Sequence, residues 1–505
     1  MKKKVALLGS LFGSVYIIIS TIGAIFIRKL FIQTFGTEYL GLTAIFSSIF
    51  GILAALDCGI SSNIFLKIYE PLAFNNREKV KSVFSLIKLV YFIRGIVVMG
   101  VGSVVYLFLP IIAQKSNFEI TFIQNAYILY LLFSVGSYFF IFYSFFMEAI
   151  QKKYLVSIIS LLSYFFLMIS QILVIKYFPN YLIYLIVSLS QGLLVYIICR
   201  ILTYRIYPYL KQKTKIGLAE KSDLKSLLGM AFHSMGSVLA SYTDAFLITG
   251  FTGITTLGLY DNYKIISDKV FVLLNQITSS IKDPMRVLMA EGDRMYAEKM
   301  LNNITFFIFW ISGLAAVCLI NMINPFIKLW LGSNYLLGNT IIIISALIVF
   351  ISTVSYIMID SYYFTECYKN DKKAPIIEII VNMLVSLVLG HYLGITGVLI
   401  GTVVYYFVQI FLRCNRLYTF YFKMSMEKYV KNFLLYVCFV IVAFIASSYA
   451  CEVFFCSNSF TELLSNAVLS IIIYNGLFWA IFAGNEYYAY FKTLLIQFLC
   501  RKNEI

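Results

Sequence analysis

The chain has 505 residues, of which 61% are apolar, 17% aromatic and only 13% charged, roughly half the charged fraction of ~25% that is usual in soluble domains. Its mean hydropathy is +0.87, and its net charge is +16. A soluble fold cannot bury that much apolar surface, and the short polar connections exclude a large extramembrane domain. The composition therefore predicts an all-α polytopic membrane protein.

Apolar runs recur from residue 9 to residue 483, and each has the ~20 residues that cross a ~30 Å hydrocarbon layer as a helix. The lysine-rich start of the first run is typical of a signal peptide. That run continues past Arg28 without a small-residue cleavage site, so we interpret it as a retained first helix. The runs predict about fourteen transmembrane helices, at residues 9–33, 39–66, 83–112, 122–148, 155–177, 181–207, 226–251, 257–283, 302–323, 339–366, 375–392, 394–412, 431–450 and 463–483.

Basic residues are divided unequally between the two sides of these helices. Of the 40 lysines and arginines, 31 lie in the two termini and in alternate connections, five at the opposite helix ends, and four inside spans. Basic residues gather on the cytoplasmic side of membrane proteins. The topology therefore accounts for the basic balance without a nucleic-acid partner, and both termini are expected in the cytoplasm.

Motifs of metal and phosphate chemistry are missing from the sequence. The nine cysteines form no Cys-x-x-Cys pair, the two histidines are far apart, and there is no Gly-x-x-x-x-Gly-Lys-Ser/Thr loop. We expect no metal site and no cofactor, so any energy for transport comes from an ion gradient or from the gradient of the substrate. Cys451 and Cys456 share the last outer loop, where a disulfide could form, although free thiols are favoured.

A short repeat indicates two like-oriented halves. Gly36-Thr-Glu-Tyr-Leu-Gly-Leu follows the first span and Gly253-Ile-Thr-Thr-Leu-Gly-Leu follows the seventh, with four of seven positions identical at an offset of 217 residues. Six spans separate the copies, so both run in the same direction, as in two six-helix halves related by an axis along the membrane normal. We predict halves at 1–210 and 222–429, an additional helix pair at 430–485 and a cytoplasmic tail at 486–505.

Charged residues inside the spans are the candidate site residues. A central Arg, Lys or Asp that faces lipid costs ~2.5–3.5 kcal/mol, so such residues must face protein or water. Arg94 in the third span and Asp57 in the second both lie near mid-depth and could pair. That pair would be either a salt bridge that only fixes packing or part of a hydrated site.

The eighth span carries the densest polar set. Asp261, Lys264, Asp268 and Asn275 follow i, i+3, i+7, i+14 spacing, which places them on one helix face. Lys264 could pair with Asp261 or Asp268 in a structural network, or it could line an aqueous cavity. The cavity-lining residues that we predict are Tyr260, Tyr263, His233 and Asn275.

Several longer stretches, taken in order, resemble a known family. They are Phe26-Ile-Arg28-Lys-Leu-Phe31, Gly36-Thr-Glu38-Tyr-Leu-Gly41-Leu, Leu56-Asp57-Cys-Gly59-Ile, Tyr69-Glu-Pro71-Leu-Ala73, Gly258-Leu-Tyr260-Asp-Asn262-Tyr263, Trp330-Leu-Gly332 and Gly394-Ile-Thr-Gly397. Their succession resembles the Wzx-type flippases, which export O-antigen and capsule repeat units and belong to the multidrug/oligosaccharidyl-lipid/polysaccharide (MOP) superfamily. Cys58 and the stretch Ile281-Lys-Asp-Pro284 depart from the family's pattern.

The resemblance implies a MATE-like fold and a secondary transporter of the bacterial cytoplasmic membrane rather than an enzyme. It implies that an undecaprenyl-diphosphate-linked oligosaccharide is moved from the inner to the outer leaflet by alternating access, with coupling to H⁺ or Na⁺ and with a polysaccharide polymerase and a chain-length regulator as partners beside the lipid bilayer. The predicted diphosphate-binding residues are Arg28, Arg94, Lys264 and Lys269, and the predicted counter-charges or ion-coupling residues are Asp57, Asp244, Asp261 and Asp268.

Two alternatives remain at this stage. A drug/cation antiporter of the same superfamily would more often have an acidic cavity and twelve spans, whereas four bases here lie inside the spans. A membrane-embedded glycan polymerase usually has a long outer loop with catalytic residues, whereas the longest outer loop predicted here has about fifteen residues, at 324–338. A flippase is the favoured interpretation.

Overall fold

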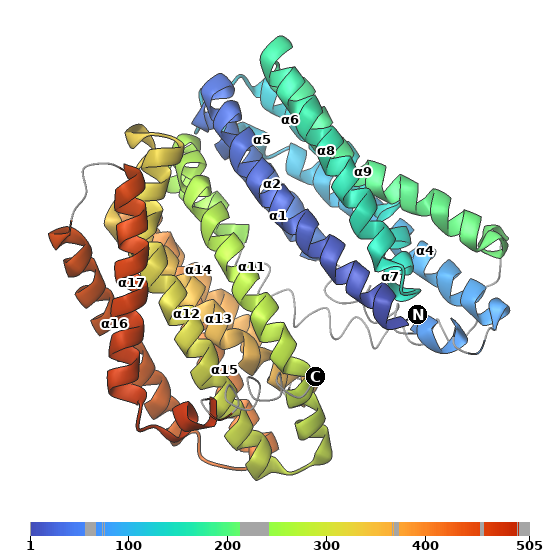
Figure 1. Ribbon diagram of the computed structural model, residues 1–505. Coiled ribbons are helices and arrows are strands. Elements are labelled where there is room, and N and C mark those ends of the chain that lie inside the picture. Colours follow the sequence, from blue (N-terminus) through green and yellow to red (C-terminus); the bar gives the residue numbers. More distant parts are fainter. Residues whose placement is uncertain are drawn as a thin grey trace. The chain divides into compact units, whose positions relative to one another are not determined.

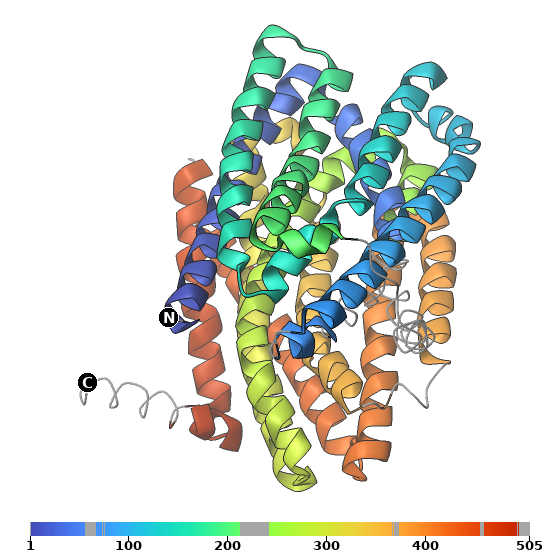
Figure 2. The same ribbon diagram turned by 90° about the vertical axis from the view of Figure 1, so that its right-hand side faces the viewer.

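The computed structural model describes residues 2–55, 67–72, 76–212, 242–365, 373–454 and 459–491, together with residues 74, 367 and 493. These described residues form helices and connections without a β-strand, as predicted for an all-α protein. By its internal contacts the chain divides into a first unit, Met1–Gly258, and a second unit, Leu259–Ile505 (Figures 1 and 2). The boundary lies beyond the connection 210–222 that separates the predicted halves.

The first unit is a bundle in which α1 packs along α8, α8 along α9, and α6 against both α4 and α9 (Figure 1). Short helical segments also cover residues 67–72 and 242–252. The longer elements are α1 (Lys2–Phe35), α2 (Thr37–Ala55), α4 (Arg77–Tyr106), α5 (Leu109–Ala113), α6 (Ile120–Tyr138), α7 (Ile141–Ala149), α8 (Lys153–Tyr177), α9 (Tyr181–Ile206) and the 3₁₀-helix η1 (Pro208–Lys211).

The second unit begins within α11 and is built around α12 and α13. The most extensive pairing is between α14 and α15, while α13 packs on both α12 and α15, and α17 packs on α12. The elements are α11 (Ile254–Glu291), α12 (Arg294–Trp330), η2 (Ser333–Tyr335), α13 (Asn339–Phe364), α14 (Ala374–Leu393), α15 (Ile395–Arg416), the π-helix η4 (Leu417–Phe422), α16 (Glu427–Val453) and α17 (Ser459–Phe482).

Twelve helices in the described part of the chain are long and apolar enough to cross a membrane. They match twelve of the fourteen predicted spans. The predicted span 226–251 lies mainly outside the described residues. The predicted span 257–283 is a continuous part of α11, in which charged residues interrupt the apolar run. The count of fourteen therefore stays a prediction.

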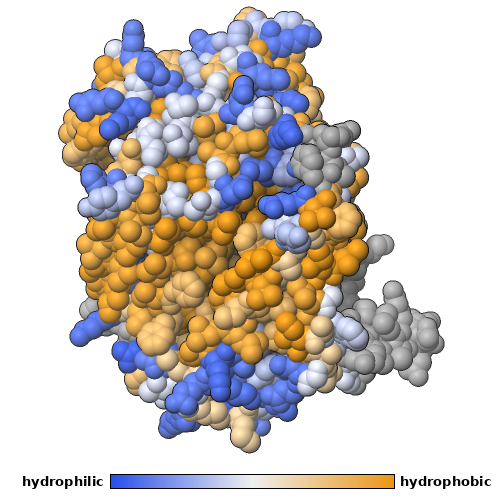
Figure 3. Space-filling model, turned by 90° about the vertical axis from the view of Figure 1, so that its left-hand side faces the viewer, coloured by the Kyte–Doolittle hydropathy of each residue, from blue (hydrophilic) through white to orange (hydrophobic). Residues whose placement is uncertain are grey.

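Exposed side chains agree with a membrane location. On the side of the molecule that carries α16 and α17, apolar side chains form a band bounded by polar residues (Figure 3). On α16 and α17 the large apolar residues Leu434, Ile445, Ile472 and Trp479 are each at least half exposed. Apolar side chains in such a band are stable in contact with lipid, where they would be unfavourable in water.

One predicted span and one predicted outer loop have different shapes in the structure. The span predicted at 122–148 is two helices, because the N–H groups of Phe139 and Phe140 bond to carbonyls only three residues back, at Gly136 and Ser137. This tight turn ends α6 before α7 begins. The outer loop predicted at 324–338 is also shorter, because α12 continues through Pro325 to Trp330.

Pro325 explains how the last helix pair is attached. A proline inside a helix has no N–H for the carbonyl four residues earlier, which here belongs to Asn321. That carbonyl instead accepts a 2.9 Å hydrogen bond from Asn466 Nδ2 on α17. The Asn321 side chain completes the junction: its Nδ2 donates to Ser447 and Ser470 at 3.1 and 2.9 Å, and its Oδ1 accepts from Ser448 at 2.7 Å. The pair α16–α17 is thus fixed to α12 by polar contacts, which lipid does not replace.

The repeated heptapeptide builds the same local structure twice. Gly36 and Gly253 have φ angles of 93° and 89°, the left-handed region that favours glycine. The N–H of each glycine bonds to the carbonyl four residues earlier, at 2.9 and 3.0 Å. A helix begins directly after each glycine, α2 after the first and α11 after the second.

The two copies also contact each other within the first unit. A Cβ added to Gly41 would overlap the carbonyl oxygen of Ile254, and one added to Gly258 would overlap that of Thr37. Residues 37 and 254, like 41 and 258, are related by the offset of 217. The first turns of α2 and α11 therefore cross with their backbones in contact and with local two-fold pseudosymmetry, and only glycine fits at either crossing point.

Candidate functional site

Arg28 lies beside a polar cluster of the first unit. It is half-buried on α1, seven residues before the helix ends, and its charge acts on the hydroxyl of Tyr184 on α9. Gln171 on α8 donates to Tyr184 Oη at 3.2 Å and to Ser188 Oγ at 2.9 Å. The guanidinium is therefore about 10 Å along the helix axis from the end of α1, next to neutral hydrogen-bonding groups.

Arg94 is held by a helix end and by aromatic rings. Its Nη2 donates to the carbonyl oxygen of Ala54 at 2.8 Å, near the last residue of α2. Its guanidinium carbon lies 4.6 Å from the centre of the Tyr138 ring and 5.7 Å from that of Tyr91. Carbonyls at a helix C-terminus and ring faces both carry partial negative charge. Asp57, its predicted partner, lies outside the described residues, so that pairing stays a prediction.

Lys264 pairs with Asp268 on α11, which is one of the two pairings that the spacing predicts. Its Nζ lies 2.7 Å from Asp268 Oδ2, with side chains that are 41% and 59% exposed. Asp261 and Lys269 are half-buried on the same helix. The described protein therefore does not seal this ion pair from its surroundings.

Tyr263 and Asn275, two predicted cavity-lining residues, have different surroundings. Tyr263 is fully buried; its hydroxyl donates to Asn324 Oδ1 at 2.7 Å and accepts from the backbone N–H of Leu337 at 2.8 Å, which joins α11 to the end of α12. Asn275 Oδ1 is buried and has no hydrogen-bond partner among the described residues. Buried polar atoms usually have a partner, so Asn275 is the more available of the two for a ligand or water.

The remaining predicted site residues fall in both units or outside the described chain. Tyr260 is buried on α11. Asp244 is half-buried in the helical segment 242–252 of the first unit. His233, like Asp57, lies outside the described residues. Cys451 has a free thiol, and Cys456 lies outside. The roles assigned to these residues stay predictions.

The most deeply buried ion pair in the described part of the second unit was not predicted from the sequence. Glu378 on α14 and Arg413 on α15 are each only 1% exposed. Arg413 Nε lies 3.0 Å from Glu378 Oε1, and Arg413 Nη2 donates to Oε2 at 3.1 Å. Gln409 also donates to Oε2, at 3.3 Å, and the Tyr362 ring on α13 lies 4.5 Å from the guanidinium carbon.

This buried pair connects three helices, and the same unit contains a second, partly exposed ion pair. Arg286 on α11 binds Asp360 on α13 through both oxygens, at 2.7 and 3.2 Å. Loss of one member of a buried pair leaves an uncompensated charge, which is strongly destabilising. Glu378 stands inside the predicted span 375–392, and an acid within an apolar run was the signal that could have found it.

Comparison with known proteins gives a fold but no close relative. No protein-family profile matches the chain, and no curated protein sequence matches it. Solved structures do match. The lipid II flippase MurJ in an inward closed conformation has a TM-score of 0.69 and 16% identity, covering 94% of this chain and 99% of that one.

Two further structures have the same fold. An inward-facing multidrug resistance MATE family transporter of the MOP superfamily has a TM-score of 0.57 and 14% identity, covering 78% of this chain and 92% of that one. A MOP superfamily transporter from Pyrococcus furiosus has a TM-score of 0.54 and 12% identity, covering 84% of this chain and 97% of that one. The chain has the MOP transporter fold. The predicted MATE-like architecture is thereby confirmed at the level of the fold.

Proposed function

We propose that this protein is a secondary transporter, and not an enzyme, that moves an undecaprenyl-diphosphate-linked oligosaccharide from the inner to the outer leaflet of a bacterial cytoplasmic membrane. The observation that carries the proposal is that two cationic side chains are half-buried rather than sealed: Arg28 on the membrane helix α1 of the first unit, and Lys264 on α11 of the second unit, within the predicted span 257–283. Cations at membrane depth are costly and usually functional. The fold adds support, because a protein named as a lipid II flippase matches nearly the whole chain.

The coverage of the matches favours a flippase over a drug/cation antiporter. The flippase covers 94% of this chain, whereas the MATE transporter covers 78%. Such a difference in coverage is expected if the match to the flippase includes the final pair α16–α17 and the match to the MATE transporter does not. The four bases inside the predicted spans also suit an anionic substrate better than a cationic drug.

The Lys264–Asp268 pair suits a binding site that must be emptied in every cycle. A diphosphate oxygen can replace Asp268 on Lys264 at low cost, because the pair is exposed. Asp268 is then free to take up H⁺ or Na⁺, and its return to Lys264 would release the substrate. Arg28, in the first unit, would offer phosphate oxygens a planar donor fork. The ion and the substrate would both act on the Lys264–Asp268 pair, and this shared pair would couple the transport of one to the transport of the other.

Transport would proceed by alternating access, with the head group bound among polar residues and the prenyl tail remaining in lipid. The polysaccharide polymerase and the chain-length regulator are the proposed partners, because they act on the exported repeat unit. The sugar of the substrate would contact tyrosine rings, which have an apolar face and a polar hydroxyl.

Export in a deletion strain tests the proposal. Wild-type protein should restore surface polysaccharide, whereas Arg28→Gln and Lys264→Gln should leave lipid-linked repeat units on the cytoplasmic leaflet. Lys29→Gln is the matched control, since Lys29 is the exposed neighbour of Arg28. Export at the wild-type level by both site variants would contradict the roles proposed for these residues. Repeat units that accumulate on the outer leaflet of the deletion strain would indicate a polymerase instead.

A further inference from the structure

A pocket of about 830 Å³ lies within the first unit, apart from the residues of the proposed transport site. Its volume is in the range of small-molecule sites. Four parts of the chain meet there: residues 67–72, the start of α4, the end of α7, and the end of α9 with η1. All four lie on the side that the basic residues assign to the cytoplasm. The principal lining residues are Tyr69, Arg77, Gln151, Tyr207 and Tyr209.

Arg77 supplies a positive charge to this pocket that no carboxylate in the described residues pairs with. It is the first residue of α4, where Asn76 caps the helix by accepting a 3.1 Å hydrogen bond from the N–H of Lys79. Its guanidinium carbon lies 5.7 Å from the centre of the Tyr209 ring, and within the described chain it forms no ion pair. The bases that follow differ: Lys79 pairs with Glu70 and Lys81 with Glu78. Arg77 is thus the base of this turn that is available to an anion.

Gln151 lines the side of the pocket opposite Arg77, and its own backbone conformation is strained. Its φ is 62°, and it stands where α7 ends: Lys152 N–H bonds to Met147 O and Gln151 N–H bonds to Glu148 O, both at 2.9 Å. These two bonds form a Schellman motif, in which glycine usually occupies the left-handed position. A non-glycine residue there is strained, and such strain gathers at ligand sites. The strain therefore indicates that the Gln151 side chain has a role besides ending the helix.

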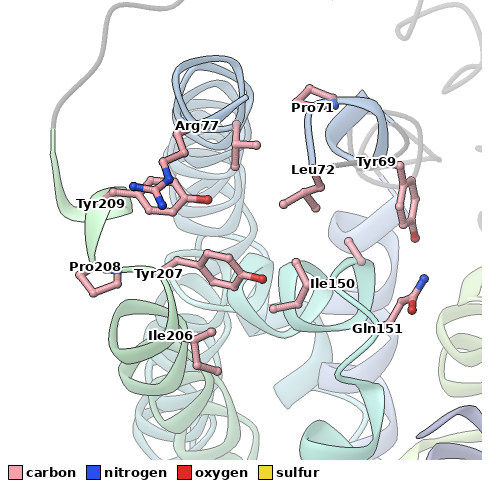
Figure 4. Close-up of a pocket in the computed structure, with 12 residues that line it drawn as sticks. Tyr69, Pro71, Leu72, Arg77, Ile150, Gln151, Ile206, Tyr207, Pro208 and Tyr209 are labelled. Atoms are coloured by element: carbon pink, nitrogen blue, oxygen red, sulfur yellow. The ribbon is translucent and has the colours of Figure 1, made fainter. Parts of the chain in front are cut away.

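The tyrosines give the pocket both ring faces and hydroxyl groups. Figure 4 shows Arg77, Tyr207 and Tyr209 on one side of the pocket and Tyr69 and Gln151 on the other. The Tyr207 and Tyr209 rings meet edge to face at 5.8 Å. Burial raises the pKa of both phenols, so both stay neutral and can donate hydrogen bonds beside an anion. Amphipathic rings of this kind suit a ligand with apolar faces and polar edges.

We propose that this pocket binds a phosphorylated sugar. Arg77 would hold the phosphate, the amide of Gln151 and the hydroxyls of Tyr207 and Tyr209 would bond to sugar hydroxyls, and the tyrosine rings would cover the faces of the sugar. The ligand could come from two sources, a soluble sugar phosphate or the diphosphate-linked head group of a glycolipid. In the second case the pocket would select the substrate on the cytoplasmic side before transport, a step that rests on the proposed function.

Binding is measured with the full-length protein in phosphatidylcholine nanodiscs. The probes are the 1-phosphates of glucose, galactose and N-acetylglucosamine, with calorimetry and saturation-transfer NMR as readouts. At least one probe should bind saturably, and Arg77→Gln should weaken its binding about tenfold or more, as expected for a charge-assisted contact. Lys79→Gln, the matched control, should change the affinity less than about twofold. Equal losses in the two variants, or no saturable binding of any probe, would overturn the proposal.

Gln151→Gly separates a ligand role from a purely structural one. Removing the strained side chain should raise the apparent unfolding temperature by about 1–3 °C, and it should weaken sugar phosphate binding about threefold or more. A rise in stability with unchanged affinity would show that the amide does not contact the ligand. Because this variant is expected to be more stable than the wild type, misfolding cannot account for a loss of binding.

Three further probes distinguish the possible occupants. A short-chain prenyl diphosphate-linked sugar that binds more tightly than the free sugar phosphate identifies the glycolipid as the source, and the reverse order identifies the soluble compound. Inorganic phosphate that binds as tightly as any sugar phosphate would overturn the sugar specificity. Phosphatidylglycerol nanodiscs that abolish sugar phosphate binding would show that a lipid headgroup occupies the pocket instead. If the wild type binds a sugar phosphate but transports no glycolipid, the proposed function is contradicted and this inference is not. If the wild type transports the glycolipid, Arg77→Gln does not change that transport, and no sugar phosphate binds, this inference is contradicted and the proposed function is not.

Discussion

Ion pairs and ring contacts hold cationic side chains in both units, but individual cations differ in which of the two partners they have. In the first unit, three arginines lie over aromatic rings at 4.6 to 5.7 Å: Arg77 over Tyr209, Arg94 over Tyr138 and Arg200 over Phe140. In the second unit, three bases pair with carboxylates: Lys264 with Asp268, Arg286 with Asp360 and Arg413 with Glu378. A ring face stabilises a cation without neutralising it, whereas a carboxylate neutralises it.

This difference has a consequence for anion binding. Arg77 keeps a positive charge that an anionic substrate can feel, whereas Lys264 must release Asp268 before it can bind an anion. Within the second unit the pairs differ again, because Arg413–Glu378 is sealed and Lys264–Asp268 is exposed. We therefore expect the first pair to maintain structure and the second to exchange partners.

Breaking the sealed pair should have the largest effect on stability. Arg413→Ala leaves Glu378 charged and buried, so we expect a loss of about 3–5 kcal/mol, measured as a lower unfolding temperature of the purified protein in detergent. Lys431→Ala, at an exposed base of α16, is the control and should change stability by less than about 0.5 kcal/mol. The double variant Arg413→Met/Glu378→Met should recover most of the loss. A stable single variant would show that the pair is not structural.

The contact between the repeated helix starts comes next. Gly41→Ala and Gly258→Ala each place a Cβ against a carbonyl oxygen of the partner helix, so each should cost about 1–3 kcal/mol. The effects should be similar because the two contacts are related by pseudosymmetry. Gly100→Ala on α4, where a Cβ would meet nothing within 4 Å, should instead be neutral or stabilising. Unequal losses at the two crossing points would break the symmetry argument.

Arg94 tests whether ring faces stabilise the cations of the first unit. Arg94→Gln removes the contact to Ala54 O and the stacking on Tyr138, with an expected loss of about 2 kcal/mol in thermal unfolding. Tyr138→Leu keeps the hydrogen bond and should cost less, about 1 kcal/mol. If Tyr138→Leu were as damaging as Arg94→Gln, packing of the ring rather than its interaction with the cation would explain the result.

The exposed pair on α11 should have the smallest effect. A double-mutant cycle with Lys264→Gln and Asp268→Asn should give a coupling energy of about 0.3–0.5 kcal/mol. A coupling above about 2 kcal/mol would mean that the pair is as structural as Arg413–Glu378, and it would remove the physical basis for exchange with a phosphate.

Local patterns in the sequence predicted much of this structure, but contacts between segments that are distant in the sequence were not predicted. Apolar runs located twelve helices, and the spacing of the charged residues predicted that Lys264 pairs with Asp261 or Asp268, because both depend on residues close together in the chain. Arg413 and Glu378 are 35 residues apart, and their pairing depends on how α14 and α15 pack. The same is true of the pocket around Arg77, whose lining comes from four segments. The break between α6 and α7 also escaped prediction, because no proline marks it.

The most direct test of the central claim is flipping of a fluorescent undecaprenyl-diphosphate oligosaccharide in proteoliposomes that contain only the purified protein. The account predicts that the wild type exposes the head group on the opposite leaflet, and that Lys264→Gln and Arg28→Gln reduce the rate about tenfold or more while the unfolding temperature stays close to that of the wild type. Flipping at the wild-type rate in both variants, or transport of a cationic drug in place of the glycolipid, would contradict it.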